Sequence, residues 1–276
     1  MHEQDWHSPW REDEHYRLWP GSGPLLISLP HDGSELPSDL HERMTASAQT
    51  VPDTDWHVGR LYDFARAMGA SILRPRWSRY VVDLNRPPDG AALYPGQSET
   101  GLCPLLTFMR EAIYRDEQAP STAEISERVD RYWRPYHSAL ASTLSHLRER
   151  FDRVLLWEGH SIVGTCPMFF EGRLPDYNLG TADERSCAPD IAAAVADMLR
   201  RSGARFAING RFKGGFITRQ YGQPHTGVSA IQMELAQSNY MREGAPFDYD
   251  ESLAATTIPV LRSMLQASLS ALSAQQ

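Results

Sequence analysis

The hydrophobic positions along the chain fall into short apolar runs separated by stretches with helical spacing. The short runs are rich in Ile, Val, Leu and aromatic residues and have the length of single strands, so they predict a set of buried strands. These runs are residues 24–29, 71–74, 80–84, 154–157, 205–208 and 230–235.

Apolar residues recur at helical spacing between these runs, over residues 58–68, 123–151, 190–201 and 252–272. Pro135 should kink or divide the long second helix, and Gly203 suits the C-terminal cap of the third. Alternating strands and helices predict an α/β fold with a mixed, largely parallel central sheet between two helical layers, α/β/α. No repeat or linker-like tract interrupts the pattern, so we expect a single domain over residues 1–276.

Composition narrows the class of protein. The chain has 27 Lys and Arg against 35 Asp and Glu, a net charge of −8, and no basic run, so we expect no nucleic-acid partner. No apolar run approaches the roughly 20 residues of a membrane helix, and the polar first twenty residues differ from a secretory signal. The three cysteines form no CxxC motif. We therefore expect a cytoplasmic protein that binds no membrane.

Two histidines follow predicted strands. His31 comes after the run 24–29 and His160 after the run 154–157, with Gly33 and Gly159 as small residues close by. Ligands in α/β folds bind outside the carboxyl ends of the strands, so the two histidines are a candidate metal pair. A catalytic zinc commonly has a carboxylate as its third protein ligand. The residues alone leave that ligand open among Asp32, Glu35, Asp53, Asp55 and Glu158; we favour Asp55 as the ligand and Asp53 as a helix cap.

Three further features suggest chemistry. The segment 79–88, from Arg79 to the Pro-Pro pair, ends an apolar run in Asn85-Arg86, and a fixed guanidinium there could bind a carboxylate. Residues 209–222 concentrate three cations and four glycines, which suits a mobile anion-binding loop. Glu234 lies inside an apolar run, where a carboxylate is costly unless it is paired or functional, as a general base would be.

The ordered segments LLISLPHDG, DTDWHVGRLYDFA, SRYVVDLNRPPDG, EGHSI and FKGGFITRQYGQPHTGVSAIQMELAQSNYM resemble the N-formylglutamate deformylase family of histidine degradation. That family is similar in turn to zinc carboxypeptidases and aspartoacylases, which implies a phosphorylase/hydrolase-like, zinc-exopeptidase-like fold. In those proteins two histidines and a carboxylate hold zinc, an Asn-Arg pair receives the substrate carboxylate, and a late Glu activates water. The chain departs from the carboxypeptidase His-x-x-Glu motif by having Ser34, which makes peptide cleavage less expected.

The resemblance implies hydrolysis of N-formyl-L-glutamate to formate and L-glutamate by an enzyme with one divalent metal ion, expected to be zinc. The expected residues are His31, Asp55 and His160 for the metal, Glu234 and Arg79 for catalysis, and Asn85, Arg86 and Arg219 for the substrate. A dianionic small molecule needs at least two local cations, which is why Arg86 and Arg219 are both chosen. The alternatives are a deacylase of another N-acyl amino acid and a non-catalytic metal- or carboxylate-binding protein. A serine hydrolase is disfavoured because no GxSxG motif is present.

Overall fold

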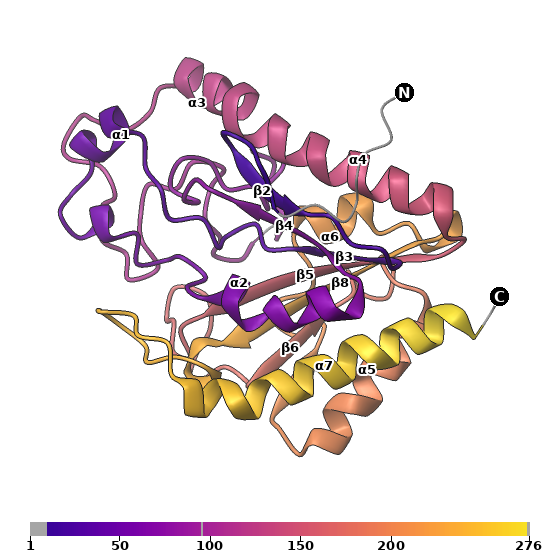
Figure 1. Cartoon of the computed structure of the whole chain (residues 1–276). Helices are drawn as coiled ribbons and strands as arrows, with labels where there is room; N and C mark the ends of the chain where they lie inside the picture. Colours follow the sequence, from indigo (N-terminus) through magenta and orange to yellow (C-terminus); the bar gives the residue numbers. More distant parts are fainter. Residues whose placement is uncertain (1–9, 95, 275–276) are drawn as a thin grey trace.

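The computed structural model describes residues 10–94 and 96–274, in which eight strands form one mixed sheet in the order β1-β2-β4-β3-β5-β8-β6-β7 (Figure 1). The strands are β1 Arg11–Glu12, β2 Tyr16–Trp19, β3 Leu25–Ser28, β4 Ser71–Pro75, β5 Val154–Ile162, β6 Tyr177–Gly180, β7 Phe206–Ile208 and β8 Val228–Ala236.

The four central strands, β4, β3, β5 and β8, run parallel. Toward one edge of the sheet, β2 is antiparallel to β4 and β1 is antiparallel to β2. On the other side, β6 is antiparallel to β8. The expectation of a mixed sheet with a parallel centre is thus confirmed. Parallel strands place their carboxyl ends at one edge of the sheet, where α/β folds bind ligands.

Helices cover both faces of the sheet (Figure 1). One face packs with α3, α4 and α6 in a first hydrophobic cluster, and the other with α2, α5 and α7 in a second. The three-layer α/β/α expectation is therefore confirmed. The helices are α1 Ser38–Arg43, α2 Val58–Leu61, α3 Thr122–Arg128, α4 Arg134–Arg150, α5 Pro189–Ser202, α6 Phe216–Tyr221 and α7 Glu251–Ser273.

The predicted helices are present with local changes. The long stretch 123–151 is divided, as expected, by a π-helical turn at Val129–Trp133 just before Pro135, the second residue of α4. The first helix is shorter than predicted, because α2 gives way to a 3-10 turn at Asp63–Met68. Gly203 ends α5 in the left-handed region, with a φ of 71°. None of the helices in residues 10–94 and 96–274 is long and apolar enough to cross a membrane.

The apolar run 80–84 was predicted to be a strand, and that prediction is wrong. These residues form buried turns, in which Val81 N donates to Ser78 O and Asp83 N to Leu102 O. Val81 and Val82 are buried in the first hydrophobic cluster. The run is apolar because it lies in the core, and burial alone does not select strand geometry.

Strands were also missed or misjudged in length. β1, β2 and β6 are too short or too polar to give an apolar run. β5 extends through His160 to Ile162, so His160 lies within a strand rather than after it. Of the first twenty residues, whose polar character was used in the sequence analysis, residues 1–9 lie outside the described part of the chain.

Candidate active site

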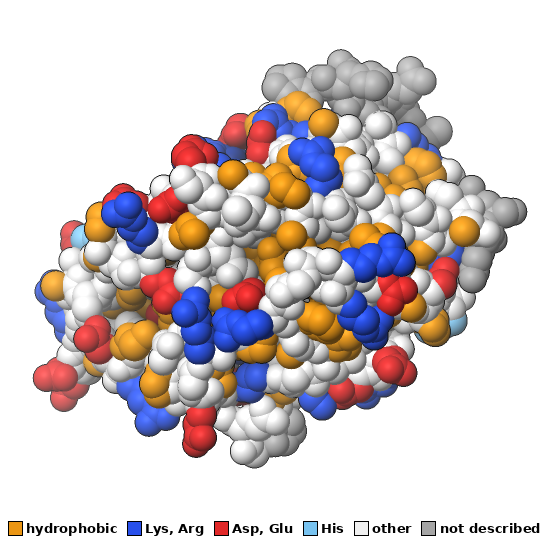
Figure 2. Space-filling model, turned by 90° about the horizontal axis from the view of Figure 1, so that it is seen from below, with side chains coloured by type: hydrophobic (Ala, Val, Ile, Leu, Met, Phe, Trp, Pro, Cys, Tyr) orange, Lys and Arg blue, Asp and Glu red, His pale blue; other side chains and the backbone are white. Residues whose placement is uncertain are grey.

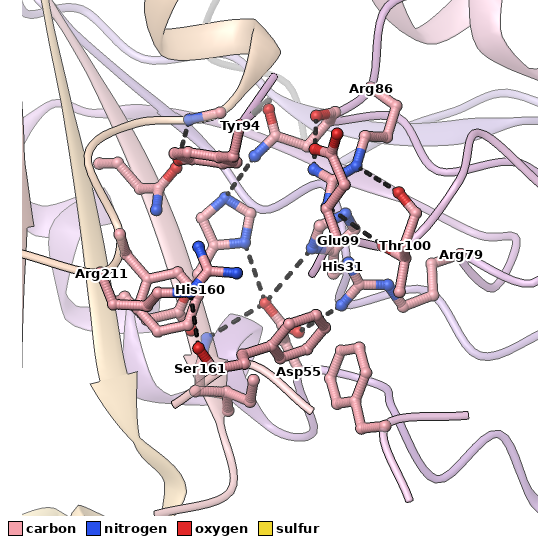
Figure 3. Close-up of a pocket in the computed structure, with 18 residues that line it drawn as sticks. His31, Asp55, Arg79, Arg86, Tyr94, Glu99, Thr100, His160, Ser161 and Arg211 are labelled. Atoms are coloured by element: carbon pink, nitrogen blue, oxygen red, sulfur yellow. Dashed lines mark hydrogen bonds and ion pairs between the residues drawn. The ribbon is translucent and has the colours of Figure 1, made fainter. Parts of the chain in front are cut away.

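Three of the predicted metal ligands converge (Figure 3). His31 lies in the turn after β3, Asp55 in the turn before α2, and His160 on β5; one ligand atom from each lies within 4.8 Å of the other two. His160 Nδ1 is 3.1 Å and His31 Nδ1 is 3.8 Å from Asp55 Oδ2. A backbone hydrogen bond from Asp55 N to His31 O joins the two turns. Asp55 is thus the carboxylate that the geometry brings to the histidine pair.

The far nitrogen of each histidine meets a buried carboxylate. His31 Nε2 is 2.7 Å from Asp83 Oδ1, and His160 Nε2 is 2.7 Å from Glu158 Oε1. A proton held on Nε2 by these carboxylates leaves the Nδ1 lone pair facing Asp55. Carboxylates that fix the tautomer in this way commonly stand behind metal-binding histidines. The donor set therefore fits a small divalent cation.

The charges around the group point the same way. Asp53, Asp55, Asp83, Glu158 and Glu234 are all buried, and Arg79 is the one Lys or Arg among the described residues whose side chain contacts this cluster by hydrogen bond or ion pair. Burying several carboxylates together is costly unless positive charge balances them. A divalent ion would provide that balance.

The pKa values follow from this crowding. Burial alone would lower the pKa of His160, but Glu158 and Asp55 raise it to about 10. Burial would raise the pKa of Asp55, yet the His160 hydrogen bond and the nearby cations hold that pKa below its ordinary value. The carboxylates around His160 thus stabilise positive charge at this position.

The remaining candidate carboxylates have other partners. Asp32 accepts from Arg74 and from Gly59 N, and Glu35 pairs with Arg76. Neither belongs to the converging group, so neither is a ligand candidate in this structure.

Asp53 is not a helix cap, contrary to the prediction, because His57 precedes α2 in that position. Its Oδ2 instead accepts from Tyr80 Oη at 2.6 Å and from Phe108 N at 2.9 Å. Asp53 therefore ties the segment around Phe108 to the turn at Tyr80.

Glu234 lies on β8 in register with His160 on β5. Its side chain lines the cavity that also contains His31, Asp55 and His160. Within residues 10–94 and 96–274, no side chain or backbone group donates a hydrogen bond to its carboxylate. Burial raises the pKa of Glu234 to about 8. It is a desolvated carboxylate without a fixed partner, beside the candidate metal ligands.

The cavity encloses about 550 Å³ of space, part of it open to solvent. Of the expected substrate residues, Asn85 and Arg86 line it, as does Arg79. Asn85 Nδ2 lies 3.2 Å from His160 Nε2, and Asn85 Oδ1 accepts from Ile217 N. The wall also includes Tyr94, Glu99, Thr100, Phe108, Ser161, Ile162, Phe169, Arg211, Phe212, Gly215 and Gln232.

Arg219 is not among the residues that line this cavity, contrary to its predicted place. Its Nη1 donates to Leu93 O and its Nε to Gly214 O, and its guanidinium stacks on Tyr94. Arg211, from the same cluster of cations, points into the cavity instead (Figure 3). The segment 209–222 is also not wholly a loop, because it contains α6.

Sequence reasoning missed Asp83 and Arg211. Asp83 had a usable signal, since it is a carboxylate inside an apolar run, the argument that selected Glu234. Arg211 had only its membership of the cation cluster, which did not distinguish it from Lys213 or Arg219.

The fold and the site together define an α/β protein with a candidate metal centre in a cavity that is also lined by three arginines. A model of the N-formylglutamate amidohydrolase family matches residues 23–241, and the chain belongs to this family. It is similar to the N-formylglutamate deformylases of Pseudomonas putida, with 46% identity over 250 residues, and Pseudomonas aeruginosa, with 47% over 250. These alignments cover 90% of this chain and 93% and 94% of the relatives.

Its fold also matches the crystal structure of an N-formylglutamate amidohydrolase from Ralstonia eutropha JMP134. The TM-score is 0.77 at 27% identity, over 92% of this chain and 97% of the other.

Proposed function

We propose that this protein hydrolyses N-formyl-L-glutamate to formate and L-glutamate, with one divalent metal ion, zinc, held by His31, Asp55 and His160. The reaction is the final step of the histidine degradation that the family resemblance implies. Membership of the family and the two similar deformylases support the substrate. The three buried cysteines, all free, are compatible with the cytoplasmic location expected from the sequence.

One observation carries the proposal: the His31–Asp55–His160 group and the unpaired Glu234 line one cavity. A bound divalent cation would lower the pKa of a water ligand and polarise the formyl oxygen. Glu234 would take the proton from the attacking water and deliver it to the leaving amine nitrogen. The buried position of Glu234 raises its basicity, which suits that transfer.

Arg79 is suited to stabilise the oxyanion of the tetrahedral intermediate. Its Nη2 is fixed by Asp83 Oδ2 at 2.8 Å, while its buried Nε has no hydrogen-bond partner among the described residues. A preorganised donor of this kind acts where negative charge develops. Asn85, which contacts His160, and its neighbour Arg86 would receive the α-carboxylate, which is attached to the carbon that bears the reacting amide.

The two alternatives make different demands on the cavity. A metal- or carboxylate-binding protein without activity would gain nothing from the partnerless carboxylate of Glu234 beside the metal ligands. A deacylase for larger acyl groups would need more room in the cavity, whose wall includes Phe108 and Ile162.

The test is to load the purified protein with zinc, determine bound metal by elemental analysis, and assay formate release from N-formyl-L-glutamate. N-acetyl-L-glutamate serves as the matched substrate with one additional methyl group. We expect one metal ion per chain and a clear preference for the formyl compound. Stoichiometric metal without formate release would contradict the proposed reaction, and a preference for the acetyl compound would favour the deacylase.

A further inference from the structure

Three arginines line the cavity, and they differ in how their charge is balanced. Arg79 forms an ion pair with Asp83 at 2.8 Å. Arg86 instead donates to Thr100 O, Thr100 Oγ1 and Asn85 O, which are neutral acceptors. Arg211 also donates only to backbone carbonyls. Within residues 10–94 and 96–274, no carboxylate oxygen lies within 4.0 Å of a nitrogen of Arg86 or Arg211. Two cations in the cavity thus lack a direct counter-charge.

The neighbours of Arg211 hold its side chain in place and leave part of its guanidinium available to bind a ligand. Its Nε donates to Phe169 O at 2.7 Å and its Nη2 to Ser98 O, which leaves Nη1 without a hydrogen bond in the described structure. The rings of Tyr94, Phe169 and Phe212 lie 5.3–5.5 Å from its Cζ. A fixed guanidinium loses little freedom when it binds a carboxylate, and the apolar rings suit the methylene groups of a side chain.

Nearby charges also favour an anion. Burial lowers the pKa of Arg211, and the positive charge of Arg86 lowers it further, so the two cations lie close enough to repel each other. Glu99 lines the same cavity, and its negative charge raises the pKa of Arg211 and so partly offsets this effect. Its Oε2 accepts from Leu93 N at 3.2 Å, and it forms no ion pair with Arg211 in the described structure. A ligand carboxylate placed against Arg211 would relieve the repulsion between the arginines.

We propose that Arg211 binds the side-chain carboxylate of the substrate and thereby makes the enzyme specific for acidic N-formyl amino acids. This inference rests on the proposed function, in which Arg86 receives the α-carboxylate. Arg211 takes the role that the sequence suggested for Arg219, because the chain directs Arg211 into the cavity and Arg219 behind Tyr94.

The experiment compares N-formyl-L-glutamate with N-formyl-L-glutamine, which has the same size and a neutral side chain. Arg211→Met should lower kcat/KM about 10- to 100-fold for the first substrate and much less for the second, since one charge-assisted hydrogen bond is lost only there. Arg211→Lys should restore part of the preference, because it keeps the charge without the planar fork.

Arg219→Met is the matched control. Arg219 has the same charge, comes from the same segment, bonds to backbone carbonyls and stacks on the same Tyr94 ring at 4.8 Å, but lies outside the cavity lining. Its removal should leave the ratio of the two kcat/KM values unchanged. An equal loss on both substrates in Arg211→Met, or an equal drop in the ratio in Arg219→Met, would overturn the proposal.

Binding supplies a second measurement that does not need turnover. Calorimetry should show that Arg211→Met weakens binding of L-glutamate about 10- to 100-fold and that of L-glutamine little. If the zinc-loaded wild type releases no formate from either substrate, the proposed function fails, whereas Arg211 is still judged by this difference. Equal weakening of both amino acids would refute the assignment of Arg211.

Discussion

Replacement of Glu234 by Gln separates catalysis from metal binding. The side chain is 7% exposed and keeps its volume in the change, and no hydrogen-bond donor loses a partner among the described residues. His31, Asp55 and His160 are untouched, so the metal should remain bound. A general base contributes on the order of 10²–10⁴ in rate, which is about 2.7–5.5 kcal/mol of transition-state stabilisation. We therefore expect kcat to fall by that factor.

Glu158→Gln is the matched comparison, since Glu158 is also buried and near His160. Its Oε1 meets His160 Nε2 at 2.7 Å and its Oε2 accepts from Thr218 N at 3.0 Å. An amide has a single acceptor oxygen, so one of these donors would face an NH₂ group. Loss of such a supporting carboxylate typically costs 10–100-fold in metal affinity. We expect weaker zinc binding and a kcat within about tenfold of wild type at saturating zinc.

The assay is formate release measured against zinc concentration for wild type and both variants, with metal content determined in parallel. Glu234→Gln should show a low plateau at the normal midpoint, and Glu158→Gln a nearly normal plateau at a raised midpoint. If Glu234→Gln keeps more than a tenth of the wild-type kcat, the residue is not the base. If the activity of Glu234→Gln rises to the wild-type plateau at higher zinc concentrations, Glu234 acts on metal binding instead.

The other predictions concern metal retention and stability. His31→Ala and His160→Ala should each lose bound metal, and full occupancy in both by elemental analysis would rule out the assignment. Burial lowers the pKa of His137 to about 4, so below pH 6.5 the unfolded chain takes up a proton that the folded chain does not. Wild type should therefore lose up to about 3 kcal/mol of stability between pH 6.5 and pH 4 that His137→Gln keeps. An equal loss of stability in the two proteins, measured by urea unfolding at both pH values, would contradict this. In Gly159→Ala the added Cβ would lie 2.7 Å from one buried side chain and 2.9 Å from another, so urea unfolding should show a loss of about 1–3 kcal/mol, and an unchanged midpoint would refute the packing argument.

The sequence predicted the layers of the fold and the metal group because both depend on local signals. His31 and His160 stand on or beside apolar runs, and the ends of parallel strands meet at one edge of the sheet. The same signal misplaced the segment 80–84, since an apolar run reports burial and a buried turn is as apolar as a strand. Asp83 could have been found from that run by asking what pairs with its buried charge.

The choice between Arg211 and Arg219 shows where local sequence stops being informative. Both residues belong to one cluster of cations and glycines, and neither lies on a predicted element whose period fixes the direction of its side chain. Arg219 is the fourth residue of the short helix α6, and that helix turns it toward Gly214 and Leu93. Tertiary contacts decide which arginine enters the cavity, and no pattern of spacing contains them.

The net charge of −8 led us to expect no polyanionic partner, but it does not predict the distribution of charge within the cavity. Carboxylates gather on the side of His31 and His160, where they can balance a dication. Arg86 and Arg211 lie on the wall with neutral partners only, where they can balance a dianion. Buried charges such as those of Asp55 and Glu234 act more strongly than they would at the surface. An acidic protein can therefore bind an acidic substrate, because the field that the substrate meets is set by a few buried groups rather than by the sum over the chain.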